Sequence, residues 1–179
     1  MKPQPRSGVL LVFVAIVAHH SLFAEVLDKT KSVAGTAVHY KVVLPSHYDP
    51  EKPYPGVLAF PGGAQTIEIA ENMLQRNWRD EAERRGYIVV IPAATKGLLF
   101  FQGGERVFPE FLDKLLADYK IRDGKFHIAG NSNGGISAFH IAAAFPVTFP
   151  MKVRTASERS RTCASTCMSA SWTTAGRKK

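Results

Sequence analysis

The sequence has few cysteines and no long apolar run. Of its 179 residues only Cys163 and Cys167 are cysteines, and no second group of Cys or His accompanies them. This excludes a disulfide framework and gives no basis for a metal site, although a local disulfide or a weak metal contact between the two remains an alternative to incidental cysteines. The longest uninterrupted apolar run, from Gly8 to Ala18, has 11 residues. A helix that crosses a bilayer needs about 20, so we expect no stable membrane span.

The central part of the chain lacks a charge excess. The formal net charge is +8, yet residues 25–150 hold 14 Lys and Arg against 14 Asp and Glu. The excess comes from Lys2 and Arg6 at the N-terminus and from seven basic residues against Glu158 alone in residues 151–179. These charges have no aromatic partners in a folded groove, so no nucleic-acid partner is expected. The 45% share of apolar residues is typical of a globular domain with a core.

The N-terminus has the pattern of a secretory signal. Basic residues precede the apolar run, and Ser21-Leu22-Phe23-Ala24 follows before the acidic Glu25. We expect residues 1–24 to be a signal peptide cleaved after Ala24, and the protein to be secreted. Leu22 is larger than the small residue usual at that position, which leaves a retained N-terminal anchor as the alternative.

Residues 25–150 show the pattern of an α/β domain. Short apolar runs without a polar face predict strands that are covered on both sides, as in a parallel sheet, and a preceding run that partly alternates predicts a strand with one solvated face. Apolar residues at helical spacing predict amphipathic helices between them. The expected strands are 36–44, 56–60, 87–91 and 126–129, and the expected helices are 67–85, 108–119 and about 134–145. This order predicts a parallel sheet flanked by helices.

Ser132 is the residue that we expect to carry out catalysis. Gly130-Asn131-Ser132-Asn133-Gly134 matches G-x-S-x-G, directly after a predicted buried strand and directly before a predicted helix. In that setting the serine sits on a strained turn with its hydroxyl above the sheet, and Gly130 and Gly134 leave room for the turn. The backbone amide of Asn133 would then point at a developing oxyanion. The alternative is an ordinary turn rich in small residues.

A second glycine-rich turn supports this interpretation. Phe60-Pro61-Gly62-Gly63 ends an earlier predicted strand, where a loop can bring a second backbone donor to the oxyanion. We assign that donor to Gly63. A tight Pro-Gly-Gly turn without any catalytic role is the alternative.

From about Thr36 to Pro146 the sequence resembles α/β-hydrolase-fold serine esterases, especially secreted polyhydroxybutyrate depolymerases and feruloyl esterases. The resemblance rests on Pro61-Gly62-Gly63, on residues 84–92 (RRGYIVVIP) and on residues 130–135 (GNSNGG). It implies a nucleophilic Ser132, an acyl-enzyme intermediate, a small-molecule or polymeric carboxylic ester as substrate, and neither a cofactor nor a metal. Many relatives have a histidine where this chain has Pro61.

The sequence lacks the partners that such a serine needs. In this fold the acid and the histidine follow the serine in chain order, but after Ser132 the chain has no Asp, the single acid Glu158 and the single histidine His140. Eight residues of helix rise about 12 Å, so His140 is out of reach of the hydroxyl. His127 and His39 have only a weak claim as a base in an unusual geometry. We therefore expect this chain to be inactive as an esterase.

The sequence changes character after Pro150. Of the 29 residues in 151–179, 10 are Ser or Thr and seven are Lys or Arg, with no strand or helix periodicity. We interpret this segment as a disordered or out-of-frame tail, with the hydrolase-type domain truncated after the helix that follows Ser132. The family's strand order would then leave the strand ending at Ala129 at an unprotected edge, which favours self-association. A non-catalytic secreted protein that binds a ligand or pairs through this edge is the alternative function.

Overall fold

The computed structural model describes residues 24–146; the expected signal peptide, apart from Ala24, and the tail 151–179 lie outside this range. No helix in the described range is long and apolar enough to span a membrane. The elements, in chain order, are β1 (Glu25–Val33), β2 (Thr36–Leu44), β3 (Tyr54–Phe60), α1 (Ile67–Met73), the π-helix η1 (Leu74–Trp78), α2 (Arg79–Arg85), β4 (Ile88–Pro92), the 3-10 helix η2 (Gly104–Val107), α3 (Phe108–Asp118), β5 (Ile121–Gly130) and α4 (Asn133–Ala144).

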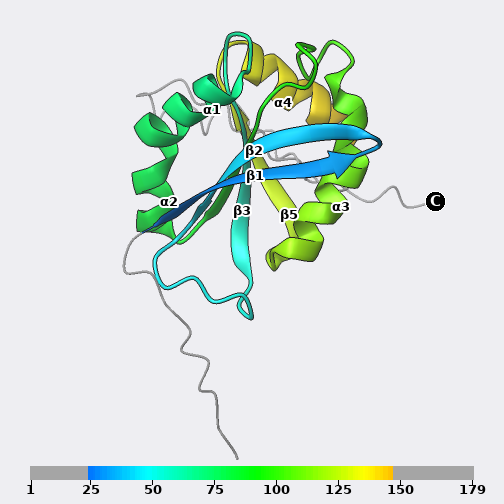
Figure 1. Ribbon diagram of the computed structural model, residues 1–179. Coiled ribbons are helices and arrows are strands. Elements are labelled where there is room, and N and C mark those ends of the chain that lie inside the picture. Colours follow the sequence, from blue (N-terminus) through cyan, green and yellow to red (C-terminus); the bar gives the residue numbers. More distant parts are fainter. Residues whose placement is uncertain (1–23, 147–179) are drawn as a thin grey trace, which may run out of the picture.

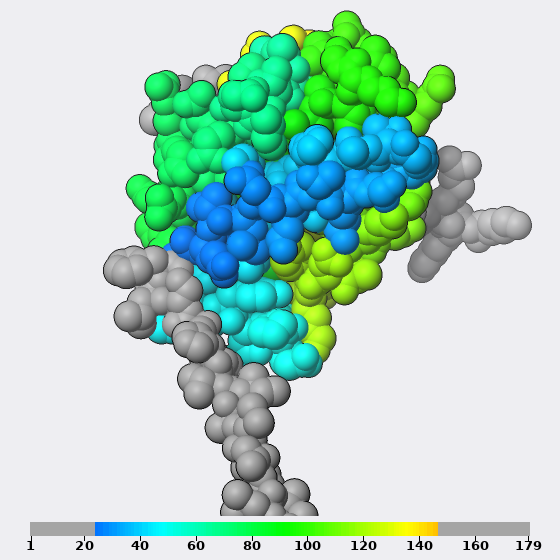
Figure 2. Space-filling model, viewed as in Figure 1, coloured from blue at the N-terminus to red at the C-terminus, as the bar shows by residue number. Residues whose placement is uncertain are grey.

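The strands form one mixed sheet in the order β1-β2-β4-β3-β5. The pairs β4–β3 and β3–β5 are parallel, as the sequence predicts, whereas β1–β2 and β2–β4 are antiparallel. The expected parallel sheet flanked by helices is confirmed for β3, β4 and β5, and β1 and β2 add an antiparallel part that the sequence analysis did not specify. β1 was not predicted at all, because within residues 24–146 it pairs only with β2 and its middle residues Asp28, Lys29 and Thr30 are exposed. Figure 2 shows this strand, in dark blue, lying across the surface of the molecule.

Helices cover both faces of the sheet, so the core has two layers (Figure 1). Along β4, Ile88 and Val90 pack in one apolar cluster and Val89 and Ile91 pack in the other. The first cluster includes residues of α3 and α4, and the second includes residues of α1, η1 and α2. Because successive side chains of a strand point to opposite faces, burial on both faces requires the unbroken apolar runs seen in the sequence.

β2 is more buried than the sequence pattern predicts. Its first residues include the exposed Ala37 and His39, but all residues from Tyr40 to Leu44 are buried. This part of β2 lies between β1 and β4, and its side chains enter both apolar clusters. The expected solvated face is therefore limited to the start of the strand.

The segment predicted as one helix, 67–85, is helical throughout but contains a π-helical turn. The side-chain oxygen of Thr66 accepts a hydrogen bond from the amide of Ile69 (3.4 Å) and caps α1. η1 then separates α1 from α2, which ends at Gly86 with a left-handed φ of 64°. A π-turn holds more residues than an α-turn and shifts the faces of the helix that follows it.

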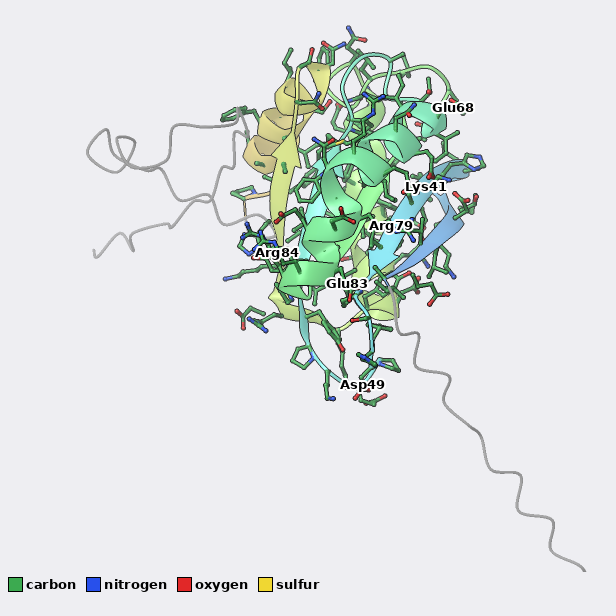
Figure 3. The ribbon with its side chains drawn as sticks, turned by 90° about the vertical axis from the view of Figure 1, so that its left-hand side faces the viewer. Lys41, Asp49, Glu68, Arg79, Glu83 and Arg84 are labelled. Atoms are coloured by element: carbon green, nitrogen blue, oxygen red, sulfur yellow. The ribbon has the colours of Figure 1, made fainter. Side chains whose placement is uncertain are left out.

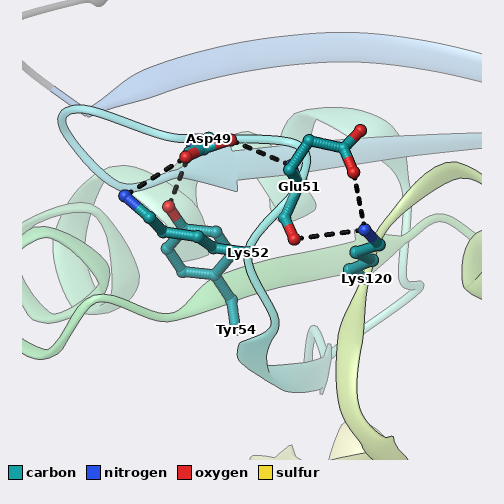
Figure 4. Close-up of polar contacts among 5 residues, drawn as sticks. All are labelled: Asp49, Glu51, Lys52, Tyr54 and Lys120. Atoms are coloured by element: carbon teal, nitrogen blue, oxygen red, sulfur yellow. Dashed lines mark hydrogen bonds and ion pairs between the residues drawn. The ribbon is translucent and has the colours of Figure 1, made fainter.

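The loop between β2 and β3 is fixed by polar contacts (Figure 4). The amide of Asp49 donates to the Tyr54 hydroxyl (2.9 Å), and the Asp49 carboxylate pairs with Lys52 (3.1 Å). Lys120, just before β5, pairs with the Glu51 carboxylate at 2.8 Å and donates to the Glu51 carbonyl at 3.1 Å. These contacts connect the starts of β3 and β5, at the opposite ends of both strands from Ser132.

β5 is longer than predicted and lies at the edge of the described sheet. It runs from Ile121 to Gly130 instead of 126–129, and its pairing with β3 is irregular near its start. Asp123 and Gly124 have positive φ values of 58° and 62° in this irregular part. Within residues 24–146, β3 is its only neighbour.

Candidate active site

Ser132 occupies a strained turn between β5 and α4. Its φ and ψ are 51° and −127°, and it precedes the first residue of α4. A non-glycine residue in such a sparsely populated region costs about 1–3 kcal/mol and persists only where the surrounding structure imposes it. The residue is exposed. The chain therefore presents this hydroxyl to solvent at the end of the sheet.

The glycines on either side of Ser132 are required by close backbone contacts. A Cβ atom on Gly130 would lie 2.2 Å from the carbonyl oxygen of Gly134. A Cβ atom on Gly134 would lie 2.1 Å from the carbonyl oxygen of Phe60, at the end of β3. Neither backbone can move without displacing an element, so the tight turn and the approach of α4 to β3 both depend on these glycines.

The loop after β3 lies against the same turn. Gly63 has a left-handed φ of 56°, and its carbonyl oxygen accepts a hydrogen bond from the side-chain amide of Asn133 (2.9 Å). A Cβ atom on Gly62 would lie 3.2 Å from the Asn131 side chain. The structure thus brings Gly63 next to Ser132 and Asn133, from which it is far apart in the sequence.

Two backbone amides at this junction have no acceptor among the residues that the structure describes. The amides of the first helical turn cannot bond within the helix, and the amide of Asn133 is the first of α4. Neither it nor the Gly63 amide donates a hydrogen bond to any residue in the described range. Amides of this kind next to a serine hydroxyl are suited to stabilise a developing oxyanion.

Gln65 is a buried residue that the sequence analysis missed. Its side-chain amide donates to the Pro61 carbonyl (3.1 Å) and to the Ser137 hydroxyl (2.9 Å), and its side-chain oxygen accepts from the Phe100 amide (3.2 Å). It is fully buried and has a positive φ of 54°. The side chain therefore connects the Gly62-Gly63 loop to α4 and to the segment before α3. The one available sequence feature was a polar residue directly after a glycine-rich turn, which is too common to be diagnostic.

A shallow cavity of about 360 Å³ opens beside Ser132. One wall is the turn at Ser132 and the Gly62-Gly63 loop, and the other is formed by α1 and η1. The lining residues are Gly62, Gly63, Ile69, Asn72, Met73, Arg76, Asn77, Asn131 and Ser132.

None of the lining residues can act as a carboxylate or imidazole base. The His140 ring lies further along α4, 3.8 Å from the Glu105 carboxylate, and His39 shares a hydrogen bond of 3.0 Å with Thr30 on the β1–β2 hairpin. His127 is exposed on β5. Residues 24–146 also contain no group of three His, Cys, Asp or Glu side chains placed to hold a metal ion.

The fold is shared with solved structures of esterases. No protein-family model matches the sequence, and no curated protein matches it. An S-formylglutathione hydrolase from Agrobacterium tumefaciens superposes with a TM-score of 0.58 and 19% identity over 75% of this chain. A ferulic acid esterase does so with a TM-score of 0.60 and 22% identity over 73% of this chain. A fluorophosphonate-binding serine hydrolase from Staphylococcus aureus does so with a TM-score of 0.59 and 14% identity over 70% of this chain.

These matches cover only part of each solved protein. The chain spans 58% of the first two structures and 54% of the third. At identities of 14–22% the likeness concerns the fold, which agrees with the mixed sheet and its two helical layers. Residues 24–146 therefore adopt an α/β-hydrolase-type fold, the fold of these serine esterases and hydrolases.

Proposed function

We propose that this chain carries the nucleophile and oxyanion part of a serine esterase site, with Ser132 as nucleophile and the amides of Gly63 and Asn133 as oxyanion donors. The observation that carries the proposal is the strained, exposed Ser132 at the mouth of one cavity, beside two amides that have no acceptor within residues 24–146. The fold shared with esterases supports a carboxylic ester, small or polymeric, as substrate class.

The reaction has two displacements. The Ser132 oxygen attacks the ester carbonyl and loses its proton to a base, while the two amides stabilise the negative carbonyl oxygen. Collapse of this intermediate expels the alcohol, which takes up the proton, and leaves an acyl group on Ser132. Water then releases the carboxylic acid and restores the serine. No cofactor is needed for either step.

We further propose that this chain by itself turns over esters very slowly. A positioned base contributes about 10²–10⁴-fold to such a reaction, and none of the described residues that line the cavity is a carboxylate or an imidazole. The oxyanion donors act without that base, so acylation of Ser132 is slow but not abolished.

The test is covalent labelling with a fluorophosphonate, which reacts with activated serines. The full chain is incubated with the reagent, with and without imidazole as an external base, and the modified peptide is identified by mass spectrometry. We expect slow labelling of Ser132 that imidazole accelerates and that Ser132→Ala abolishes, with the buried Ser137 unlabelled. Absence of labelling even with imidazole would reject the proposal and favour a binding protein.

We also propose that residues 1–24 direct secretion. The support is that β1 begins at Glu25, directly after the expected cleavage position, so removal of the preceding residues leaves every strand intact. Expression in a host that secretes proteins, followed by N-terminal sequencing, should give a mature chain beginning at Glu25. A secreted or membrane-retained chain that still begins at Met1 would instead support the anchor.

The second candidate function is pairing or ligand binding without catalysis. It is favoured by the position of β5 at the edge of the sheet formed by residues 24–146 and by the exposed Ile136 and Phe139 on the adjacent α4. A second copy of the chain could pair along this edge.

A further inference from the structure

The cavity beside Ser132 has one charged residue in its lining. Ile69 and Met73 supply apolar surface, Asn72 and Asn77 supply side-chain amides, and Arg76 supplies a positive charge. No Asp or Glu is among the lining residues. The space next to the nucleophile is therefore positively charged at neutral pH, because arginine stays protonated.

Arg76 has no partner in the described range, unlike its basic neighbours. Arg79 donates to the Gln75 side chain (3.4 Å), and Arg84 and Arg85 pair with Glu81 at 2.7 and 2.5 Å. No hydrogen bond or ion pair within residues 24–146 involves the Arg76 guanidinium. Its five donors are thus available to a bound molecule.

The local backbone holds Arg76 at this position. It is the central residue of η1, and π-helical turns of this kind occur frequently at functional sites. Asn72, Met73, Arg76 and Asn77 all line the cavity, so this stretch of the helical segment faces Ser132 with one cation and two amides. Arg79, one turn further, lines a different cavity with Ala24, Asp80 and Glu83; Figure 3 shows Arg79 and Glu83 on this helical segment.

We propose that this cavity selects esters that carry a negative charge, with Arg76 binding a carboxylate of the ester while the ester carbonyl lies at Ser132. The inference rests on the proposed role of Ser132 and adds the substrate class. A planar guanidinium binds a carboxylate through two parallel hydrogen bonds, and Asn72 or Asn77 can donate a further one. A neutral ester of the same shape leaves Arg76 hydrated and gains none of these contacts.

The experiment measures binding in the full-length Ser132→Ala chain, where no reaction can occur. The ligands are monomethyl succinate and methyl 4-methylpentanoate, two methyl esters with the same number of non-hydrogen atoms and the same branching, of which only the first carries a carboxylate. Binding is followed by NMR titration of the backbone amides at low ionic strength. We expect the anionic ester to bind about 3- to 10-fold more tightly, and Arg76→Gln to remove this preference. Arg79→Gln removes the same charge from the other cavity and should retain it.

Three results would overturn the proposal: equal affinity for the two esters, no binding of either ester, or the same loss of preference in both arginine variants. The third result would mean that the preference arises from the overall charge of the molecule and not from Arg76. Failure of the proposed function is recognised separately, because it is read from covalent labelling of Ser132 in the unmodified chain. A chain that binds the anionic ester through Arg76 but never labels would be a carboxylate-binding protein.

Discussion

At the scale of single residues, the candidate site depends on a strained backbone conformation and on buried polar contacts. Ser132 is held at a positive φ, and Gln65 is buried with all three of its side-chain hydrogen bonds made inside the protein. Removal of the Cβ at residue 132 should therefore relieve strain, whereas removal of the Gln65 amide should destabilise the loop.

The Ser132→Gly variant should be more stable than the Ser132→Ala variant. Both substitutions remove the hydroxyl, but only alanine keeps the Cβ that disfavours φ 51° and ψ −127°, so we expect Ser132→Gly to exceed Ser132→Ala by about 1 kcal/mol in the free energy of unfolding. Ser137, inside α4, is the control, because glycine is the poorer residue there. Urea denaturation measures all four variants. The same order at both positions would contradict the strain at Ser132.

Replacement of Gln65 by leucine should be among the most damaging changes in the molecule. It leaves the Pro61 carbonyl, the Ser137 hydroxyl and the Phe100 amide without partners in a buried place, at a cost of about 2–4 kcal/mol. Gln75→Leu, which removes an exposed hydrogen bond to Glu71, should cost less than about 0.5 kcal/mol.

The Gln65–Ser137 contact can be isolated by a double-mutant cycle. If the two side chains interact, the loss of stability in Gln65→Leu with Ser137→Ala should be smaller than the sum of the single losses, by about 1 kcal/mol. Strictly additive losses would mean that Gln65 does not hold α4 through Ser137.

At the scale of elements, the site is the meeting point of β3, β5 and α4 on one side and of α1 and η1 on the other. The helix after Ser132 approaches the end of β3 so closely that only a hydrogen atom fits on Gly134. The adjoining glycine of the same helix is under no such constraint.

Gly134→Ala and Gly135→Ala should therefore differ sharply. An added Cβ at residue 134 would lie 2.1 Å from the Phe60 carbonyl oxygen and displaces α4 or β3, and we expect a loss of more than about 2 kcal/mol. At residue 135 the nearest atom lies at 3.5 Å, and the higher helix propensity of alanine makes the change neutral or stabilising. The Tm values of the two variants, measured by thermal unfolding, test this difference. Equal Tm values would show that α4 is not in contact with β3.

Lys41 connects the sheet to the helical layer on one face (Figure 3). Its ammonium pairs with Asp28 on β1 and, at 2.7 Å, with Glu71 on α1. Burial disfavours the charged lysine, but hydrogen bonds to Asp28 and Glu71 outweigh this and raise the pKa of Lys41. The hydrogen bond from Lys41, helped by the one from Gln75, lowers the pKa of Glu71 below its usual 4.5.

These shifts predict how acid affects the pair. A carboxylate with a lowered pKa stabilises the fold above its usual pKa, and that contribution is lost as the pH falls through the lowered value. The stability of the wild type relative to Lys41→Met should therefore decline between pH 7 and pH 3. Lys125→Met, at an exposed position on β5, is the control and should show a smaller change. A difference that stays constant with pH would exclude the Lys41–Glu71 pair as its source.

At the scale of the whole molecule, local patterns predicted most elements but not how they are combined. The apolar runs of β3, β4 and β5 were sufficient to predict a parallel core. A strand that is buried on both faces is an unbroken run of apolar residues, and such a run can be recognised in a single sequence. β1 escaped prediction because its exposed residues Asp28 to Thr30 depend on β2 for a place in the sheet. The turn at Ser132 was foreseeable from its glycines, whereas Gln65 and Arg76 acquire their surroundings only from segments distant in the chain.

The exposed edge predicts self-association of the whole chain. β5 has one strand neighbour in the described range, and Ile136 and Phe139 on α4 are 53% and 42% exposed. Sedimentation velocity at increasing protein concentration should show dimers or larger species. The double substitution Ile136→Lys with Phe139→Lys should reduce them, while Ala37→Lys on the β1–β2 hairpin should not. A monomer at every concentration that melts cooperatively would reject the prediction.

The long separation of the contacting residues at Ser132 has a consequence for folding kinetics. Asn133 meets Gly63 across 70 positions of the chain, and Gln65 meets Ser137 across 72. Closing loops of that length is slow relative to hairpin and helix formation, so these contacts should form after the β1–β2 hairpin and the helices. During synthesis, a chain whose residue 137 has not yet emerged lacks the contact between Gln65 and Ser137. We therefore expect the ability of Ser132 to react to appear abruptly at the end of folding, without gradual gain as the elements form.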